Sequence, residues 1–289
     1  MIAAFARGLR VHHWAKNLLV FVPLLTAHEW SNAAAFRSAL LAWAAFSLCA
    51  SGMYLLNDLL DAEDDRRHPR KRERPVASGA LSRALAGAGA IALPLAGLGL
   101  ALALPQAFLW CLAGYVLAAA AYSAYLKRRV IADVLTLAGL HTLRVIAGAA
   151  AIGVPLSFWL LAFSVFLFLG LALAKRCTEL RVRGDGVEAG WARGYLPGDL
   201  GYLRIMGVAS GYAAVVVFAL FIHSAEVAES YGTPELLWLS CPALLYWISR
   251  IWLKEARGTL PDDPLVHALR DPASYAVLAV MIAALWLAL

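Results

Sequence analysis

Residues 34–65 read AAFRSALLAWAAFSLCASGMYLLNDLLDAEDD and join a long apolar run to a cluster of acidic side chains. A helix that crosses a bilayer needs about 20 mostly apolar residues, and the run before Asn57 is long enough. The stretch therefore predicts a membrane-spanning helix over residues 34–60 that carries oxygen-bearing side chains at its end.

The whole chain has the composition of a membrane protein. Of its 289 residues, 62% are hydrophobic and 15% are charged, and the mean hydropathy is +0.70. We expect an all-α, polytopic membrane protein that forms one domain over residues 1–289 and binds no nucleic acid. Apolar runs bounded by polar clusters predict nine helices, at residues 14–28, 34–60, 84–104, 106–126, 130–151, 154–176, 198–224, 235–253 and 272–289. An alternative with eight spans places residues 14–28 in the membrane interface.

The connections between these helices alternate between strongly basic and nearly uncharged ones. All but three of the 25 Lys and Arg residues fall on the basic side, and the exceptions are Arg37, Arg144 and Arg204. Basic loops of membrane proteins stay in the cytoplasm. We therefore expect this side to face the cytoplasm of a bacterial-type inner membrane, with the C-terminus on the other side.

The acidic motif NDLLDAEDD at residues 57–65 is the first candidate for chemistry. Its residues Asn57, Asp61 and Asp65 follow one another at i, i+4 and i+8, which places their oxygens on one helical face. Such oxygens suit Mg²⁺, which keeps several waters and bridges to substrate phosphates. The alternative is an acidic helix end that only neutralises the basic loop after it.

That basic loop, RRHPRKRERP at residues 66–75, provides Arg72 and Arg74 as candidate phosphate ligands. Metal-binding acids beside guanidinium groups are what a diphosphate ester needs, because arginine binds phosphate oxygens bidentately. The alternative is a cluster that sets the topology or binds lipid headgroups.

Further polar residues are predicted near the same membrane side. Arg144 falls inside a helix, where a charged residue indicates a functional site or a partner for another buried polar group. The remaining candidates come from HHWAKN, YSAYLKRRVIAD and KRCTEL, and they are Lys16, Tyr122, Lys127, Asp133, Lys175 and Arg176.

Together these residues resemble the UbiA superfamily of intramembrane prenyltransferases, whose mark is an NDxxDxxxD motif at the end of the second of nine helices, here residues 57–65. The resemblance covers nearly the whole chain and implies nine helices around a cytoplasm-facing central cavity. Members that prenylate aromatic rings carry a second aspartate-rich motif after the sixth helix. This chain departs from that pattern, because KRCTEL with Lys175, Arg176 and Glu179 stands there.

Five shorter motifs resemble one branch of the superfamily, the decaprenyl-phosphate phosphoribosyltransferases. They are WxKN at 14–17, HPxKRxRP at 68–75, YSxxLK at 122–127, LRxIAG at 143–148 and KRxxEL at 175–180. The resemblance implies Mg²⁺-dependent transfer of a 5-phosphoribosyl group from phosphoribosyl diphosphate to a polyprenyl phosphate, with release of diphosphate, in cell-wall synthesis. Its abundant cations fit a donor and an acceptor that both carry phosphate.

The expected roles divide the candidates into two sets. Mg²⁺ is expected on Asn57, Asp61 and Asp65, and Lys127 and Tyr122 complete the catalytic set. The residues expected to bind substrate are Lys16, Arg72, Arg74, Asp133, Arg144, Lys175 and Arg176.

Three other functions fit parts of the same sequence. One is an aromatic prenyltransferase of quinone or haem biosynthesis that uses a polyprenyl diphosphate. Another is a sugar-lipid enzyme with a different phosphorylated donor, and the third is a transporter of an anionic metabolite. An oligomer is compatible with any of them.

Overall fold

The computed structural model describes residues 2–67, 71–183, 194–224, 227, 231–261 and 263–289. The chain divides into two compact units, one of Met1–Thr136 with Leu140–Leu156 and the other of Leu137–Gly139 with Ser157–Leu289. Every regular element in the described part of the chain is a helix, which confirms the predicted all-α class.

The first unit contains the helices up to residue 156. Its elements are α1 (Ile2–Gly8), the 3-10 helix η1 (Val11–Phe21), α2 (Val22–Thr26), α3 (Ala33–Leu60), α4 (Ala62–Arg67), η2 (Lys71–Glu73), α5 (Arg83–Ala101), α6 (Gln106–Ala124), η3 (Leu126–Arg128) and α7 (Ala132–Ile152).

The second unit contains the later helices. Its elements are α8 (Phe158–Arg183), η5 (Pro197–Asp199), α9 (Leu200–Ile222), η6 (Pro234–Leu239), α11 (Ser240–Ala256), α12 (Pro264–Ala268) and α13 (Pro272–Ala288). Helix α8 packs along α9, and α11 contacts both α9 and α13.

Seven of the described helices are long and apolar enough to cross a membrane, and α13 is a shorter apolar helix. The first expected span, residues 14–28, is not one α-helix. It consists of η1 followed by the five-residue α2, with Pro23 in the first turn of α2. Nine spans and a cavity open to the cytoplasm therefore stay predictions.

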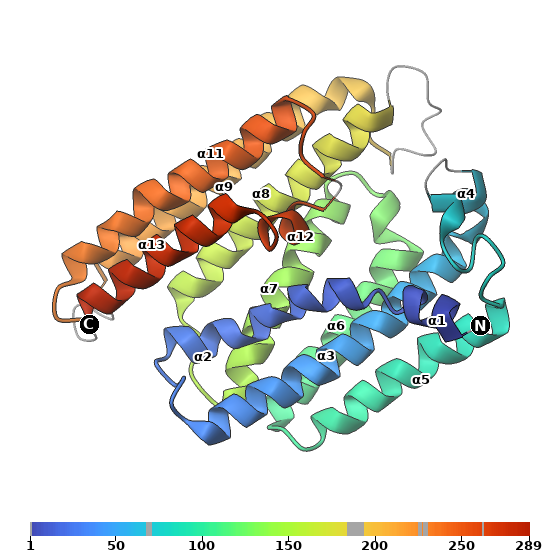
Figure 1. The fold of residues 1–289 in the computed structure, drawn as a ribbon, viewed down its shortest axis with the longest axis horizontal. Helices are drawn as coiled ribbons and strands as arrows, with labels where there is room; N and C mark the ends of the chain where they lie inside the picture. Colours follow the sequence, from blue (N-terminus) through green and yellow to red (C-terminus); the bar gives the residue numbers. More distant parts are fainter. Residues whose placement is uncertain (1, 68–70, 184–193, 225–226, 228–230, 262) are drawn as a thin grey trace. The chain divides into compact units, whose positions relative to one another are not determined.

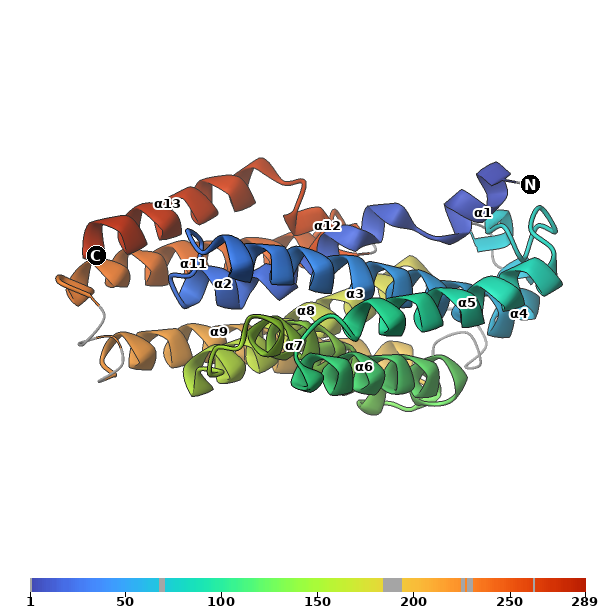
Figure 2. The same cartoon turned by 90° about the horizontal axis from the view of Figure 1, so that it is seen from below.

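Helix α3 is the central element of the first unit. Its first turn is capped by Asn32, whose side chain accepts hydrogen bonds from the backbone N–H groups of Ala34 and Ala35. It runs beside α5 (Figures 1 and 2) and also contacts η1 and α6. The approach to α5 is close because Gly52 has no Cβ; a Cβ there would lie 2.4 Å from Cδ of Pro94.

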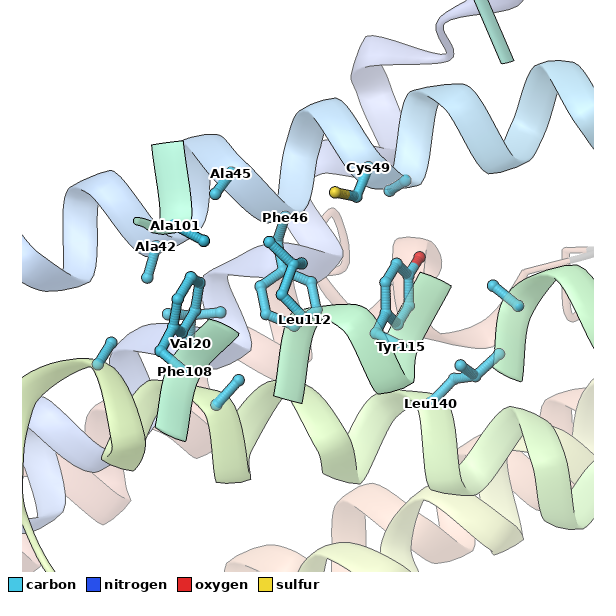
Figure 3. Close-up of a cluster of buried hydrophobic side chains, with 14 of the residues drawn as sticks. Val20, Ala42, Ala45, Phe46, Cys49, Ala101, Phe108, Leu112, Tyr115 and Leu140 are labelled. Atoms are coloured by element: carbon cyan, nitrogen blue, oxygen red, sulfur yellow. The ribbon is translucent and has the colours of Figure 1, made fainter. Parts of the chain in front are cut away.

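The apolar core of the first unit lies between α3, α6 and α7 (Figure 3). Phe46 of α3 is fully buried and packs on Phe108 and Tyr115 of α6, with ring centroids 6.0 and 5.0 Å apart. Leu140 of α7 belongs to the same cluster. Burying aromatic side chains of this size supplies much of the packing energy of a core. This core holds the acidic end of α3 in a fixed position relative to α6 and α7.

Candidate functional site

The acidic end of α3 meets Lys127, which lies in η3 directly after α6. The Lys127 Nζ donates to Oδ1 of Asn57 at 3.1 Å and forms an ion pair with Oδ1 of Asp61. Asn57 Nδ2 in turn donates to Oδ2 of Asp61 at 3.1 Å. Two oxygens, one from Asn57 in α3 and one from its C-cap residue Asp61, therefore converge on the buried ammonium of Lys127.

A second cation, Arg74, joins two other carboxylates of the motif. Its Nη1 lies 2.7 Å from Oδ2 of Asp65 and 3.5 Å from Oδ1 of Asp58. Arg74 follows η2, so the basic loop folds back onto the helix end from which it starts. The structure thus brings Arg74 to the acids, and it leaves Arg72 exposed in η2. Residues 68–70 of the HPxKRxRP motif lie outside the described residues.

The expected single row of Asn57, Asp61 and Asp65 is divided between these two cations. Helix α3 ends at Leu60, and Asp61 is its C-cap with φ −95° and ψ 1°. Asp65 belongs to the next short helix, α4, and is buried. The change of backbone direction at Asp61 gives Asp65 a different cationic partner from the one that Asn57 and Asp61 share.

Arg10 is part of the cluster and was not predicted. Its guanidinium forms an ion pair with Oδ1 of Asp58, which is 1% exposed, and lies 5.2 Å from the ring centroid of Tyr54. Arg10 has left-handed backbone angles, φ 51° and ψ 49°, where η1 begins. Asp58 lies in the NDxxDxxxD motif, and a buried acid requires a cationic partner. The signal available in the sequence was that Asp58 needs a cationic partner, and this signal does not identify Arg10 among the basic residues.

Oxygen Oδ2 of Asp58 is buried and accepts no hydrogen bond from any described residue. A buried carboxylate oxygen without a donor costs free energy. Within the described residues, an additional donor or cation at this oxygen would therefore lower the free energy of the cluster.

The WxKN motif fastens η1 to α3. Trp14 Nε1 donates to Oγ of Ser51 at 3.0 Å, and Asn17 Nδ2 donates to Oγ of Ser47 at 3.1 Å. Lys16, expected to bind substrate, is also buried in this segment. The motif therefore has a packing role that its sequence did not reveal.

Arg144 lies deeper, in the apolar core, and is 3% exposed. Its Nε donates to Oδ1 of Asn17 at 2.8 Å, and Nη2 donates to the hydroxyl of Tyr115 at 3.1 Å. Nη1 donates to the carbonyl of Leu140, one turn earlier in α7, at 2.5 Å. These contacts match the alternative in which Arg144 satisfies other buried polar groups. A role in substrate binding stays a prediction.

Two other candidates of the first unit lie near Lys127 in the sequence. Tyr122 is half-buried in the last turn of α6, and Asp133 is fully buried in the first turn of α7. The backbone N–H of Asp133 donates to the carbonyl of Arg129 at 3.1 Å. Both residues frame the η3 segment that carries Lys127.

The KRCTEL motif lies in the second unit, near the end of α8. Arg176 is 1% exposed and forms an ion pair with Glu179 one turn later, and Lys175 is half-buried. The motif therefore neutralises one of its own cations. Its predicted role in holding a second anionic group stays a prediction.

The donor set at the end of α3 fits Mg²⁺. Among the described residues, no three His, Cys, Asp or Glu side chains form a metal cage. Mg²⁺ does not need one, because it is usually bound by one or two carboxylates, several waters and substrate phosphates. The ammonium of Lys127 already stands where oxygens of Asn57 and Asp61 converge, so these two oxygens can share one cation.

Comparison with known families and proteins gives consistent matches. The model of the UbiA prenyltransferase family matches residues 18–259. The chain is 36% identical to the Sinorhizobium fredii protein y4nM, which is described as uncharacterized, over 97% of this chain and 55% of that protein. The chain therefore spans about half of the length of that relative.

Two further relatives match over most of both chains. Nodulation protein NoeC of Azorhizobium caulinodans is 36% identical, with 93% of this chain and 88% of that protein covered. The decaprenyl-phosphate phosphoribosyltransferase of Mycolicibacterium smegmatis is 28% identical, with coverages of 94% and 87%.

Among solved structures, a UbiA homologue from Archaeoglobus fulgidus bound to DMAPP and Mg²⁺ has the same fold. The TM-score is 0.75 and the sequence identity 17%, with 97% of this chain and 98% of that chain covered. The apolar helices and these matches together indicate that the protein is a multi-pass membrane protein.

Proposed function

Because the chain belongs to the UbiA prenyltransferase family, we propose that it transfers a 5-phosphoribosyl group from phosphoribosyl diphosphate to a polyprenyl phosphate. The observation that carries this proposal is the cluster at the end of α3, where the carboxylates of the motif meet Lys127 and Arg74. Hard oxygen ligands beside cationic side chains are what a diphosphate leaving group requires. The match to a decaprenyl-phosphate phosphoribosyltransferase supports the choice of donor and acceptor.

The sequence after the sixth expected helix favours this donor over a prenyl diphosphate. KRCTEL supplies Lys175 and Arg176 where aromatic prenyltransferases of the family are expected to carry acids. A donor with a diphosphate and a 5-phosphate requires more positive charge than a prenyl diphosphate does. We assign these two residues to the second anionic group, either the 5-phosphate or the lipid phosphate.

In the proposed reaction, the bond between ribose C1 and the diphosphate oxygen breaks, and its electron pair leaves with the diphosphate. An oxygen of the lipid phosphate forms the new bond to C1. Lys127 and Arg74 stabilise the charge that develops on the diphosphate as C1 acquires oxocarbenium character, and Arg72 adds to this field. The attacking oxygen is already anionic, so the step needs no general base.

Mg²⁺ would be held by Asn57, Asp61 and Asp65, and when bound it supplies Lewis-acid neutralisation of the leaving diphosphate. Tyr122 would orient a phosphate by hydrogen bonding. The other residues assigned to substrate are Lys16, Asp133 and Arg144. We infer that this site faces the cytoplasm across a bacterial-type inner membrane, because the positive-inside rule predicts that the basic connections stay in the cytoplasm.

The test uses purified protein in detergent with Mg²⁺, a short polyprenyl phosphate and phosphoribosyl diphosphate labelled in the ribose. The proposal predicts that label enters the organic phase and that EDTA prevents this. A parallel reaction contains a prenyl diphosphate and an aromatic acceptor. Consumption of the prenyl diphosphate, with no label in the lipid, would overturn the proposal in favour of an aromatic prenyltransferase.

A further inference from the structure

The cluster at the end of α3 is electrically balanced within itself. Three carboxylates, those of Asp58, Asp61 and Asp65, meet three cations. The cations are Arg10, Arg74 and Lys127. In this arrangement, the positive charge that a diphosphate needs is already neutralised by carboxylates. A phosphate that approaches must compete with them for Arg74 and Lys127.

The three cations differ in how firmly they are held. Arg10 pairs with the most buried acid and also lies over the ring of Tyr54. Arg74 is 24% exposed and is shared unequally, at 2.7 Å from Asp65 and 3.5 Å from Asp58. Because Arg10 remains on Asp58, the departure of Arg74 removes the cationic partner of Asp65 alone. A cation that binds Asp65 in its place avoids the cost of a buried carboxylate without a partner. The ammonium of Lys127 lies at the end of a flexible four-carbon side chain, so it can move by rotation of side-chain bonds alone.

We propose that Lys127 and Arg74 are exchangeable placeholders that occupy the cation positions of the site until a divalent cation binds. The divalent cation competes with Lys127 for the oxygens of Asn57 and Asp61. It competes with Arg74 for the carboxylate oxygen of Asp65. When displaced, both side chains become available to a diphosphate. The metal therefore adds its own charge and also releases two cations that were neutralised. This inference rests on the proposed function, and it makes diphosphate binding depend on prior binding of the metal.

The structure offers matched controls beside the cluster. Arg128 follows Lys127 directly, and its guanidinium lies 3.8 Å from Asp64, with side chains 64% and 68% exposed. This pair carries the same charges as Lys127 and Asp61 but lies in solvent. Removing the charge of Arg128 changes the net charge of the region as much as removing that of Lys127, and the same holds for Asp64 and Asp61. Neither control substitution alters the exchangeable pairs.

The first experiment measures metal binding alone, with Mn²⁺ as the probe and electron paramagnetic resonance to count free ion. Lys127→Met removes the competing ammonium, so we expect it to bind Mn²⁺ about tenfold more tightly than the wild type, equivalent to about 1.4 kcal/mol. Arg128→Met is expected to bind Mn²⁺ as the wild type does. Tighter binding in both variants would indicate a general effect of charge and would overturn the exchange.

The second experiment measures the binding of inorganic diphosphate by titration calorimetry, in Mg²⁺ and in EDTA. We expect the wild type to bind diphosphate at least about tenfold more weakly in EDTA. Asp61→Asn frees Lys127, so in EDTA it is expected to bind diphosphate more tightly than the wild type. Asp64→Asn is expected to match the wild type in both conditions.

Equal affinity of the wild type with and without Mg²⁺ would overturn the proposal, and so would an Asp61→Asn variant as weak as the wild type in EDTA. Asp65→Asn, which frees Arg74 in the same way, provides a second variant if Asp61→Asn does not elute as a single species. The dependence of diphosphate binding on the metal can be tested independently of which donor the protein uses. Metal-dependent diphosphate binding without phosphoribosyl transfer would refute the proposed function alone, and transfer without the pattern would refute the exchange alone.

Discussion

Two polar clusters lie along α3, and different groups neutralise their charges. Near its middle, the cluster around Arg144 consists of one cation and uncharged partners, the side chain of Asn17, the hydroxyl of Tyr115 and a carbonyl. At its end, the cluster around Asp61 consists of carboxylates and cations. The first joins η1, α6 and α7 through dipoles that stay in place, whereas the second can exchange one cation for another.

The difference separates a structural use of buried charge from a functional one. Arg144 is buried in the apolar core. If it is substituted, each of its partners loses a hydrogen-bond donor that water cannot replace there. The carboxylates at the helix end are partnered by long side chains that are partly exposed or flexible. We therefore expect mutations in the first cluster to lower stability, and mutations in the second to lower activity.

The largest effect is expected for Lys127→Met, which removes the cation nearest Asn57 and Asp61. Loss of one donor to a developing charge lowers kcat by about 10²–10³-fold. Phosphoribosyl transfer at saturating Mg²⁺ measures the effect, and Arg128→Met is the control that should keep the wild-type rate. Equal losses in both variants would show that only the general charge of the loop matters.

The next largest effect is expected for Arg144→Met. It leaves Asn17 Oδ1 and the Tyr115 hydroxyl without their donor in the core, at about 1–3 kcal/mol for each buried group. Unfolding in mixed detergent micelles measures the loss. If Arg144 binds substrate instead, this variant will keep its stability and lose donor affinity, and the contrast between the two clusters will fail.

A smaller effect is expected at Gly148, where α7 approaches η1. A Cβ at this position would lie 2.2 Å from the carbonyl oxygen of Val20. Gly148→Ala must therefore push η1 away, and overpacking of this kind costs about 1–3 kcal/mol. In the same helix, a Cβ at Gly139 meets no described atom within 4 Å, so Gly139→Ala should not destabilise the protein in the same assay.

The smallest effect concerns pH and a third ion cluster, which lies in the second unit. Arg250 binds Asp271 with both terminal nitrogens and holds the pKa of that carboxyl far below its usual range. Burial and the neighbouring Lys254 lower the pKa of His267. Lys254 Nζ lies 2.9 Å from Nε2 of His267.

For both groups the unfolded chain binds protons more readily, so stability increases with pH in the range where the two states differ. The contribution of His267 is fully present above about pH 6.5 and declines below it. The contribution of Asp271 is fully present above about pH 3.9 and is lost as the pH falls toward the lowered pKa of the folded state. Melting temperatures in detergent at pH 7.5 and 5.5 should therefore differ, with the lower value at pH 5.5. His267→Gln is expected to reduce this difference, and an unchanged difference would assign it to other groups.

Much of the fold could be predicted because a membrane-spanning helix is marked by a local run of apolar residues. The helix expected over residues 34–60 is α3, Ala33–Leu60, since an uninterrupted apolar run begins after the capping Asn32. The segment 14–28 was different, because its geometry depends on contacts with distant residues. It fits against Gly148 and presents Asn17 to Arg144, and neither partner can be identified from the segment itself.

The candidate site was predictable in residue type and less so in pairing. The motif and the basic residues after it indicated Asp61, Arg74 and Lys127, and the structure brings each of these cations to an acid. The pair of Arg10 with Asp58 was missed, since the two residues are 48 positions apart. Sequence charge counts show that cations are present, but only the folded chain shows which acid each one neutralises.

The most direct test of the central claim is the mass of the lipid after incubation of polyprenyl phosphate with phosphoribosyl diphosphate and Mg²⁺. It compares wild type, Asp61→Asn and Asp64→Asn, with equal folding checked by gel filtration. We expect wild type and Asp64→Asn to add one phosphoribosyl unit to the lipid and Asp61→Asn to add none. Equal product from both variants, or unmodified lipid with the wild type, would contradict it.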